Sequence, residues 1–169
     1  TNLTGARDAE QFAREHVVDC LALAPYLAAG RVLDVGSGAG LPGIVIAIVR
    51  PDLALTLLEP RARRARFLTQ VAIELALSHV DVVCARAETY RGPGNYDYVV
   101  SRAFGSLAAF VAAVLPQCSR QTTLIAMKGA IDAADLAAAE GIAGPAVVER
   151  LEVPGFDHRH LVRFAAAAK

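Results

Sequence analysis

Short apolar runs alternate along the chain with longer stretches in which apolar residues recur at helical spacing. The runs have the near-continuous apolar character of strands buried on both faces of a parallel sheet, and they lie at 32–35, 54–58, 80–84, 96–101 and 122–127. Helices are predicted at about 8–28 with a break near Pro25, then at 44–49, 61–78, 107–118 and 132–140. Two further strands, near 146–153 and 160–166, are expected to pair as a hairpin-like edge. The alternation predicts an α/β fold, with a doubly wound sheet of about seven mostly parallel strands and the last strand antiparallel.

The strand at 32–35 leads into a turn in which Gly36, Gly38 and Gly40 alternate with small residues, and a helical stretch follows. Glycine suits this place because the turn must reach positive φ and let the backbone touch a ligand without a Cβ in between. Strand, glycine turn and helix in this order are typical of the first unit of an open parallel sheet that binds a nucleotide-like ligand. A turn that serves only tight packing is the alternative.

Two registers of this turn predict different ligands. Gly38, Gly40 and Gly43 fit the dinucleotide fingerprint G-x-G-x-x-G, which would bind NAD. In that register Asp34 would face a pyrophosphate of like charge, and Pro42 would offer no N–H where the helix begins. The register that starts two residues earlier suits S-adenosylmethionine (SAM), because its sulfonium and amine attract a nearby carboxylate. The sequence therefore favours SAM, with Asp34 and the turn glycines as its contacts.

Charged residues follow three other strands of the predicted sheet. Glu59 closes the second strand, where an acid accepts both ribose hydroxyls of a nucleotide or, alternatively, caps the next helix. Glu88 follows the third strand, where a backbone N–H and a carboxylate can meet the edge of an adenine ring. Arg102 follows the fourth strand, and strands one and four flank the ligand cleft at the switch point of such a sheet. A strand-end salt bridge is the other interpretation of Arg102.

Four arginines, Arg61, Arg63, Arg64 and Arg66, open the helix predicted over 61–78. Positive charge near a helix N-terminus opposes the macrodipole, so helix stability offers no reason for the run, whereas contact with phosphates does. The alternative is a solvated face paired with Glu74 and other acids. The inner face of this helix is predicted to carry Phe67, Leu68, Val71 and Leu75.

The composition indicates one domain of 169 residues with 17 basic and 17 acidic side chains, so nucleic-acid binding would have to rest on a local basic patch. Cys20, Cys84 and Cys118 are scattered in largely apolar sequence, which predicts buried thiols in a reducing cytoplasm rather than disulfides. The four histidines lack metal-ligand spacing, and no metal is expected. The polar first residues resemble no signal peptide and no apolar run approaches membrane-spanning length, so a soluble cytoplasmic protein is expected.

Methyl transfer from SAM is a single in-line displacement, in which the protein positions the acceptor. Carbon 5 of a pyrimidine would need a cysteine nucleophile in the cleft, and the apolar surroundings of all three cysteines argue against it. An exocyclic adenine amine goes with an Asn/Asp-Pro-Pro-aromatic sequence after the fourth strand, where this chain has Ser101-Arg102-Ala103-Phe104. Guanine N7 has an in-plane lone pair and no proton, so it needs no general base. The lack of an evident base or nucleophile is compatible with that acceptor.

Several dispersed motifs together resemble a known family over essentially the whole chain. They are Asn2-Leu3-Thr4, Arg7-Asp8, Asp19, Ala24-Pro25-Tyr26-Leu27, Asp34 to Gly43, Arg64-Ala65-Arg66-Phe67-Leu68, Ser101-Arg102-Ala103-Phe104, Lys128-Gly129 and Arg159-His160-Leu161-Val162. In these motifs the chain closely resembles the bacterial 16S rRNA guanine-N7 methyltransferases, the RsmG (GidB) family. Leu-Pro-Gly after the glycine turn and Ser-Arg-Ala-Phe after strand four are the most discriminating of them.

The resemblance implies a class I SAM-dependent methyltransferase with a Rossmann-like fold. It implies SAM as cofactor and, as substrate, N7 of a guanine in 16S rRNA of the small ribosomal subunit near the decoding centre, with the base turned out of its stack. The cofactor contacts that it implies are Gly36, Leu41, Ala87, Glu88 and Arg102, beside Asp34, Gly38 and Glu59. Family members usually have Asp where this chain has Glu59.

No catalytic residue is identified with certainty. The resemblance matches Arg86, Arg102 and Lys128 to basic positions of the family around the cleft, which makes them candidates for positioning the RNA substrate or for binding the methionine carboxylate of SAM. Arg63, Arg64, Arg86 and Lys128 are the candidates for RNA contacts. An arginine that donates to guanine O6 would hold the base and leave N7 free.

Members of the family carry a helical segment ahead of Asn2-Leu3-Thr4, and this sequence begins at Thr1. We therefore expect an N-terminal helical segment over 1–30, with the upstream family extension missing, and a methyltransferase domain over 31–169. The missing part would hold RNA contacts or form one wall of the cleft. A monomer that acts on 16S rRNA or the small subunit, away from membranes, is expected. A small-molecule methyltransferase, an NAD-binding module and a SAM-binding assembly factor without turnover remain the alternatives.

Overall fold

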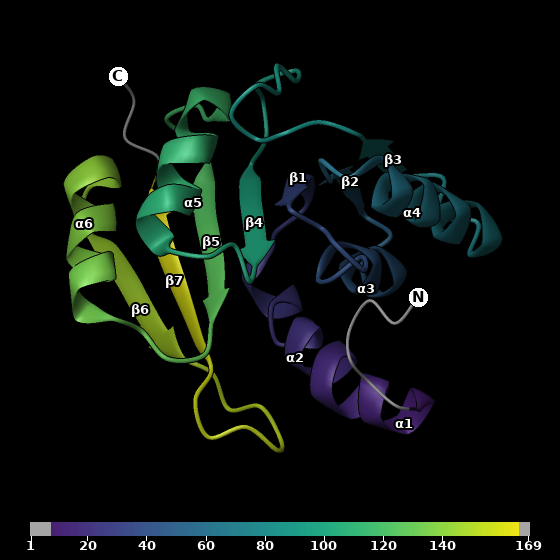
Figure 1. Cartoon of the computed structure of the whole chain (residues 1–169), viewed down its shortest axis with the longest axis horizontal. Coiled ribbons are helices and arrows are strands. Elements are labelled where there is room, and N and C mark those ends of the chain that lie inside the picture. The colour runs from purple at the N-terminus through teal and green to yellow at the C-terminus, as the bar shows by residue number, and fades with distance from the viewer. Residues whose placement is uncertain (1–7, 166–169) are drawn as a thin grey trace.

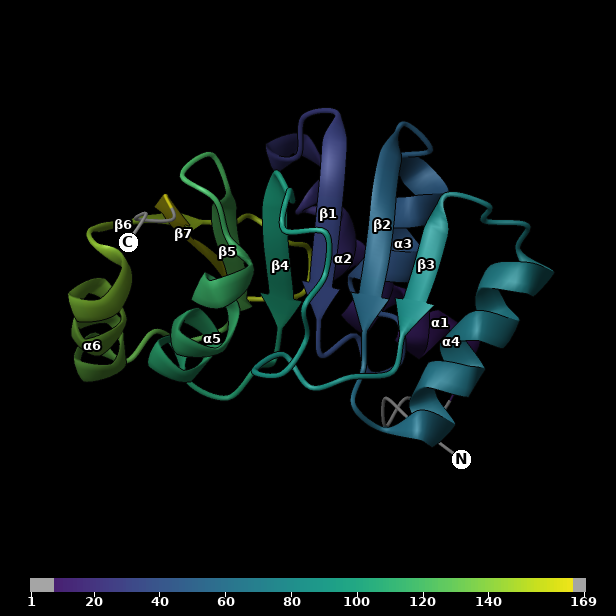
Figure 2. The ribbon, with the colours of Figure 1, turned by 90° about the horizontal axis from the view of Figure 1, so that it is seen from above.

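A computed structural model describes residues 8–165 of the chain, so Asn2-Leu3-Thr4, Arg7 and most of the alanine-rich end lie outside the described residues. Seven strands form one sheet in the order β3-β2-β1-β4-β5-β7-β6 (Figures 1 and 2). The strands are β1 Gly30–Val35, β2 Leu53–Leu58, β3 Val80–Val83, β4 Tyr98–Arg102, β5 Thr123–Lys128, β6 Ala146–Arg150 and β7 His160–Ala165. Strands β1 to β5 pair in parallel, and β7 runs antiparallel to both β5 and β6. The predicted fold class is confirmed, including the antiparallel last strand.

Helices cover both faces of this sheet (Figure 2). Side chains of α5 (Leu107–Val114) and α6 (Ala133–Ala143) form a core on one face, whereas α3 (Gly43–Val49) and the segment after α2 (Val18–Leu21) build a core on the other. Helix α4 (Ala62–Glu74) packs beside α3 over β2 and β3. The remaining short helices are α1 Ala9–Phe12, η1 Ala13–Val17, η2 Ala24–Tyr26 and η3 Leu115–Gln117. The architecture is thus three layers, helix on sheet on helix.

Neighbouring side chains on one strand enter opposite cores. Leu33 and Val99 belong to the core under α5 and α6, and Val32 and Val100 to the core under α3. All four are at most 1% exposed. Because successive strand side chains point to opposite faces and helices cover both faces, such strands read as continuous apolar runs.

The predicted N-terminal helix over 8–28 is interrupted. Asp8 caps it as expected, since its Oδ1 accepts the Gln11 N–H at 2.8 Å. The helix passes through the π-helical η1, ends at Leu21 and gives way to the 3-10 helix η2 around Pro25. The predicted break near Pro25 is confirmed. The division of the chain at residue 30 into a helical segment and a methyltransferase domain stays a prediction.

The helix predicted over 61–78 is shorter, and its inner face was predicted only in part. It ends at Glu74, and Ala76 takes a left-handed conformation with φ of 52°. Leu68 is fully buried and Val71 packs against the same core. Phe67 is 42% exposed, and Leu75, which lies beyond the helix, is 48% exposed. Their predicted burial is wrong, because the helix ends about one turn earlier than predicted and Phe67 lies outside its buried face.

The structure also differs from the prediction in the burial of one cysteine and in the ends of one helix and one strand. Cys20 is buried and Cys118 half-buried, but Cys84 is exposed, so its predicted burial is wrong; all three are free thiols. The helix predicted to reach residue 118 changes to η3 after Val114, where Pro116 has no N–H for an α-helical bond. The strand predicted to reach residue 153 ends at Arg150. Among the described residues, no helix has the length and apolar character needed to cross a membrane.

Helix α6 caps helix α5 with a carboxylate. Asp135 Oδ2 accepts the Leu107 N–H at 2.7 Å and its Oδ1 accepts the Ala108 N–H at 3.1 Å. Ser106 Oγ accepts the next N–H, that of Ala109, at 3.1 Å. Partial desolvation opposes the effect, but the two backbone N–H groups hold the pKa of Asp135 below its ordinary value. This contact holds α5 and α6 together beside β4 and β5.

Replacing Asp135 with alanine is expected to lower the free energy of unfolding by roughly 1–3 kcal/mol, because two N–H groups at the start of α5 lose a charged acceptor. The native carboxyl has a lowered folded-state pKa, so its contribution is full above the unfolded pKa of about 3.9 and is lost as the pH falls through the folded-state value. Urea unfolding of both proteins between pH 3 and 7 measures this difference. Asp157→Ala, which removes an exposed carboxylate, is the control. An equal loss at all pH values would contradict the electrostatic cap.

Candidate active site

The glycine turn after β1 is held by backbone hydrogen bonds across the sheet. Gly36 and Ser37 donate their N–H groups to the carbonyl of Leu58 at 2.8 and 3.2 Å. Gly36, Gly38 and Gly40 have φ of 74°, 58° and 92°, as predicted for glycines that must take positive φ. A Cβ at Gly40 would lie 2.6 Å from Ile44 Cγ1, so this glycine serves close packing of the turn on α3. The turn therefore needs glycine for two reasons: its backbone takes positive φ, and at Gly40 a side chain would collide with α3.

Asp34 lies beneath this turn, fully buried. Its Oδ2 accepts the N–H of Gly43, the first residue of α3, at 3.0 Å, while Oδ1 has no partner among the described residues. Burial raises the pKa of Asp34 to about 7, although the Gly43 hydrogen bond and the nearby charge of Arg102 lower it. An unsatisfied buried carboxylate oxygen is costly and fits a site that a cationic group completes.

Glu59, directly after β2, braces the turn from the other side. Its Oε2 accepts the Gly38 N–H at 3.0 Å and its Oε1 accepts the Arg61 N–H at 2.9 Å, and the residue is only 2% exposed. Glu59 thus supports the start of α4, as the capping interpretation predicts, and it also contacts the glycine turn. Its predicted contact with the ribose hydroxyls stays a prediction. A carboxylate offers about four lone-pair sites, of which these bonds use two, so acceptor capacity for two hydroxyls remains.

A pocket beside the turn is lined by residues at or after the ends of four strands, β1 to β4. They are Val35, Gly36, Leu58, Pro60, Ala85, Arg86, Ala87, Glu88 and Phe104. Ala87 is buried, and its N–H has no hydrogen-bond partner within residues 8–165. Its carbonyl accepts from the buried side chain of Gln117 at 3.3 Å, which fixes this loop. A free N–H next to an exposed carboxylate fits the edge of an adenine ring, as the sequence suggested.

Not all predicted cofactor residues line this pocket. Gly36, Ala87 and Glu88 do, whereas Gly38, Leu41, Asp34 and Glu59 lie on or under the adjoining turn. Arg86, a predicted RNA and positioning residue, lines the pocket and forms an exposed ion pair with Glu88 at 3.5 Å. The orphaned Oδ1 of Asp34, the spare acceptors of Glu59 and the free Ala87 N–H together fit SAM.

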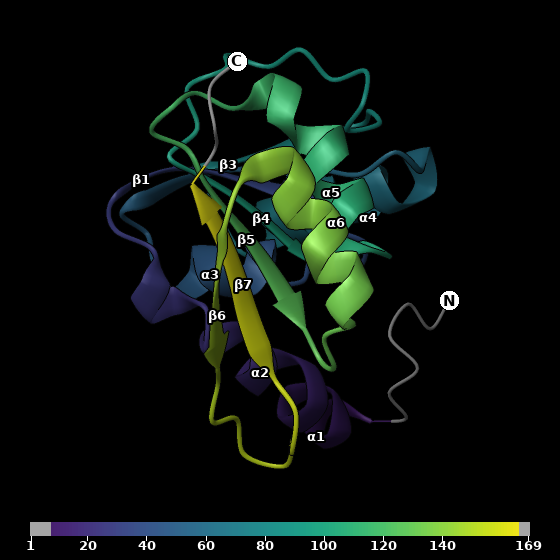
Figure 3. The ribbon, with the colours of Figure 1, turned by 90° about the vertical axis from the view of Figure 1, so that its left-hand side faces the viewer.

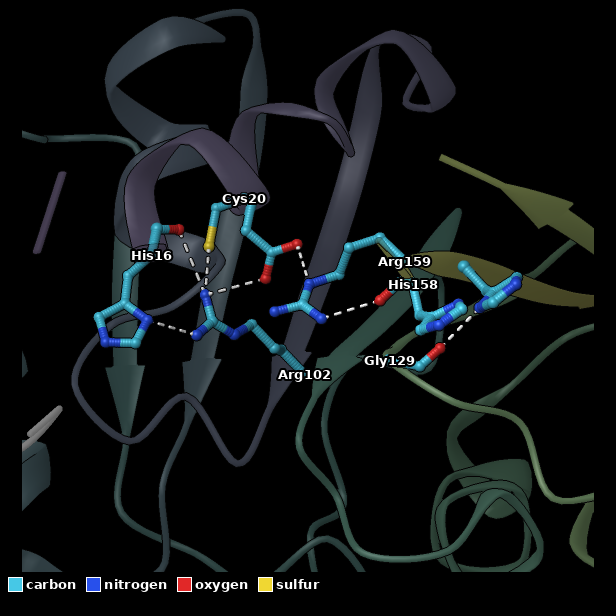
Figure 4. A network of polar contacts seen from close by, with 8 residues as sticks. His16, Cys20, Arg102, Gly129, His158 and Arg159 are labelled. Atoms are coloured by element: carbon cyan, nitrogen blue, oxygen red, sulfur yellow. Dashed lines mark hydrogen bonds and ion pairs between the residues drawn. The ribbon is translucent and has the colours of Figure 1, made fainter. Parts of the chain in front are cut away.

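Arg102, at the end of β4, is directed toward the N-terminal helices (Figure 4). Its Nη1 donates to the His16 carbonyl at 3.2 Å and to Cys20 Sγ at 3.3 Å, and its Nη2 donates to His16 Nδ1 at 2.8 Å. Nη1 also lies 3.4 Å from Asp19 Oδ2. Arg102 therefore joins the predicted cleft to the segment before β1, and the salt-bridge interpretation describes its present contacts.

A second cavity lies at the ends of β4 and β5, next to Arg102. It is lined by Asp19, Arg102, Ala103, Met127, Lys128, Gly129 and Arg159. Lys128, a predicted substrate residue, lies here and donates to the Gly105 carbonyl. Asp19 is 3% exposed and binds Arg159 as well as Arg102. The sequence predicts no role for Asp19 or Arg159 beyond their place in the family motifs. The one local sign of a buried ion pair is the acidic Asp19 within an otherwise apolar stretch of helix.

The arginine run at the start of α4 lies on the surface. Arg61, Arg63 and Arg66 are exposed and Arg64 is half-buried. Arg61, Arg64 and Arg66 take part in none of the ion pairs within residues 8–165. Glu74, their suggested partner, instead accepts from Gln70 Nε2 at 2.8 Å. The arginines thus lie on a solvated face, but Glu74 pairs with none of Arg61, Arg64 and Arg66 within the described residues.

The rings of His16, His79 and His160 have structural contacts. His79 Nε2 lies 3.1 Å from the Ala47 carbonyl and His160 Nδ1 2.6 Å from the Gly129 carbonyl. Within residues 8–165, no group of three or more potential ligands could hold a metal ion.

Comparison with known proteins gives consistent matches along the chain. The family model described as GidB, rRNA small subunit methyltransferase G, matches residues 1–162. The ribosomal RNA small subunit methyltransferase G of Marinomonas sp. strain MWYL1 is 41% identical over 162 residues, which cover 95% of this chain and 78% of that protein. The protein of the same name from Chromobacterium violaceum is 42% identical over 165 residues, with coverage of 96% and 78%.

A solved structure has the same fold at low identity. The S-adenosylmethionine-dependent methyltransferase SibL in its apo form superposes with a TM-score of 0.77 at 16% identity, covering 94% of this chain and 57% of its own.

Replacing Asp34 with asparagine tests the cost of the buried charge. The folded-state pKa of Asp34 is raised from 3.8 to about 7, so its contribution to stability is full below 3.8 and is lost as the pH rises through 7. Asparagine keeps an acceptor for the Gly43 N–H without the charge. The ligand-free variant should therefore gain stability relative to the native protein between pH 4 and 7.5, by up to roughly 2–4 kcal/mol.

Denaturant unfolding of both proteins across this pH range measures the gain. Glu152→Gln, at an exposed carboxyl, is the control and should show no such slope. A difference between native protein and Asp34→Asn that stays constant with pH would show that Asp34 is ionised throughout.

Proposed function

Since the chain belongs to the rRNA small subunit methyltransferase G family, we propose that it transfers a methyl group from SAM to N7 of a guanine in 16S rRNA. The observation that carries the proposal is the adjacency of two sites at one edge of the sheet. One is the glycine turn with its buried acids, and the other is the cationic cavity at the ends of β4 and β5. A cofactor site and an RNA site are thereby brought next to each other.

The residues around the turn would hold SAM from both of its ends. We assign the ribose hydroxyls to Glu59, the adenine edge to the Ala87 N–H and Glu88, and the amine of the methionine part to the orphaned oxygen of Asp34. Gly36 and Leu41 provide backbone and apolar contact along the turn. The bound cofactor supplies an electrophilic methyl group on a positively charged sulfur. A pyrophosphate would meet the Asp34 charge instead, which disfavours NAD at the same turn.

The chain needs to position guanine N7 rather than activate it. N7 carries a lone pair and no proton, so no general base is required, and the rate depends on near-attack geometry. Among the described residues, no cysteine lines either pocket: Cys20 is buried with its pKa raised to about 12 by desolvation, and Cys84 and Cys118 lie outside both linings. A mechanism with a covalent cysteine adduct is therefore not supported.

Surface cations would hold the RNA along the same edge. We assign RNA contacts to four cations near the carboxyl ends of the strands. Arg63 and Arg64 lie in the first turn of α4 after β2, Arg86 follows β3, and Lys128 is the last residue of β5. Because the whole chain carries 17 basic and 17 acidic groups, this local patch rather than the net charge would attract phosphates. We further propose that the protein acts as a monomer in the reducing cytoplasm, which suits its three free cysteines.

Methylation of purified small ribosomal subunits tests the proposed function directly. Subunits and naked 16S rRNA from a strain without the corresponding gene are incubated with the protein and SAM, and 7-methylguanine is mapped by mass spectrometry of nuclease fragments. The expected result is one new 7-methylguanine in 16S rRNA. Binding of SAM without any new methylated base would instead indicate an assembly factor without turnover.

Replacing Glu59 tests the proposed ribose contact. Glu59→Gln keeps the size but turns one of two carboxylate oxygens into a donor, so it should weaken binding of S-adenosylhomocysteine about 10- to 100-fold. Glu59→Asp should bind more tightly than Glu59→Gln, because it keeps both acceptors. Isothermal titration calorimetry measures both, with Glu74→Gln on exposed α4 as the matched control. Unchanged affinity in Glu59→Gln would mean that this acid only braces Gly38 and Arg61.

A further inference from the structure

We propose that the cavity at the ends of β4 and β5 binds a phosphodiester group of the RNA strand beside the target guanine, with Arg159 and Lys128 as direct donors and Asp19 as the residue that positions Arg159. The inference rests on the proposed function, which supplies the RNA. It adds two residues, Arg159 and Asp19, from opposite ends of the chain. Neither belongs to the turn or to the arginine run.

The cavity has the charge that an anion requires. It measures about 210 Å³, and its lining contains three cationic side chains, those of Arg102, Lys128 and Arg159, against one carboxylate. Within that lining there is no aromatic side chain on which a base would stack. A phosphate, which needs charge-assisted hydrogen bonds and no stacking surface, fits this lining better than a nucleobase.

Asp19 contacts both arginines of the cavity with its two carboxylate oxygens. It is 3% exposed, with Oδ1 3.0 Å from Arg159 Nε and Oδ2 3.4 Å from Arg102 Nη1. The three residues come from α2, from the end of β4 and from the turn between β6 and β7, which reaches beyond the sheet in Figure 3. A buried carboxylate shared by two guanidinium groups thus closes one side of the cavity.

The two arginines differ in which of their terminal nitrogens already bind protein groups. Both terminal nitrogens of Arg102 are engaged by His16, Cys20 and Asp19 (Figure 4). Arg159 donates with Nε to Asp19 and with Nη1 to the His158 carbonyl, whereas its Nη2 has no partner within residues 8–165. Arg159 can therefore bind a ligand through Nη2 without giving up a protein contact, whereas each terminal nitrogen of Arg102 already holds one.

Arg159 is also held in one orientation. Its guanidinium lies 3.9 Å from the centre of the Phe156 ring, and a Cβ at Gly129 would come within 3.4 Å of its Nη1. The Gly129 carbonyl is in turn bound by His160 Nδ1 at 2.6 Å. A guanidinium fixed by a ring, a carboxylate and the His158 carbonyl is preorganised, so little conformational entropy is lost on binding.

Two anions could meet these donors, a phosphodiester or the carboxylate of the methionine part of SAM, and one experiment separates them. Arg159→Gln removes the charge, Arg159→Lys keeps it without the fork, and Arg150→Gln is the matched control on the far side of the same turn. For each protein we would measure S-adenosylhomocysteine affinity, melting temperature, and kcat and KM for methylation of unmethylated small subunits at several salt concentrations.

The phosphate site predicts that Arg159→Gln raises the RNA KM about tenfold, with kcat and S-adenosylhomocysteine affinity within about twofold of the native protein. The slope of log KM against log salt should fall by about 0.7–1, the value of one phosphate contact. Arg159→Lys should keep most of the slope, and Arg150→Gln should match the native protein. A parallel loss of S-adenosylhomocysteine affinity with an unchanged slope would overturn the proposal in favour of the methionine carboxylate, and an unchanged KM would overturn it outright.

The positioning role of Asp19 is tested by a double-mutant cycle. Asp19→Asn should reproduce the rise in KM and the loss of slope, and it should add clearly less to KM when Arg159 is already glutamine. Equal effects of Asp19→Asn in both backgrounds would overturn this role. Native-protein methylation is scored separately, so failure of the native protein to methylate rRNA counts against the proposed function and not against this cavity.

Discussion

The buried carboxylate of Asp34 is the constraint on which the geometry of the site depends. Asp34 lies one residue before the end of β1, accepts the first N–H of α3 and has no exposed surface. A Cβ at Gly43 would lie 2.6 Å from this carboxylate and 2.2 Å from Leu57 Cδ2, so α3 can begin here only with glycine. Burying an acid with one oxygen unpartnered costs stability. A cationic part of the cofactor bound near Asp34 would offset this loss of folding stability.

From Asp34 a series of alternating charges runs across the carboxyl ends of the strands. The charge of Arg102 acts on Asp34, Arg102 contacts Asp19, and Asp19 contacts Arg159. Parallel strands bring these groups together, because their carboxyl ends share one edge of the sheet, and the antiparallel β7 returns Arg159 to that same edge. The helical segment before β1 supplies Asp19, so it is part of the site as well as of the core.

Local features of the sequence predicted the parts of this structure that depend on local physics. Five parallel strands were recognisable because both faces of the sheet are covered, and the glycine turn because its φ values suit only glycine. Arg102 was identified by its place after a strand, yet its partners, His16 and Cys20, lie more than 80 residues away in the sequence. No period or spacing encodes such a contact. For the same reason the exposure of Phe67 could not be read from a helical stripe, since it depends on what covers α4.

The arrangement of charge also suits the reaction that we propose. Transfer from a sulfonium to neutral guanine moves one positive charge across the site and leaves the total unchanged, so the protein must avoid a free cation beside the methyl group. Arg102 lies at the end of β4, where Asp19 pairs with it and its terminal nitrogens also bind the carbonyl and Nδ1 of His16. Arg159, on the other side of Asp19, keeps a free donor. One buried carboxylate thus pairs with the arginine at the end of β4 and orients the arginine that we propose binds a phosphate.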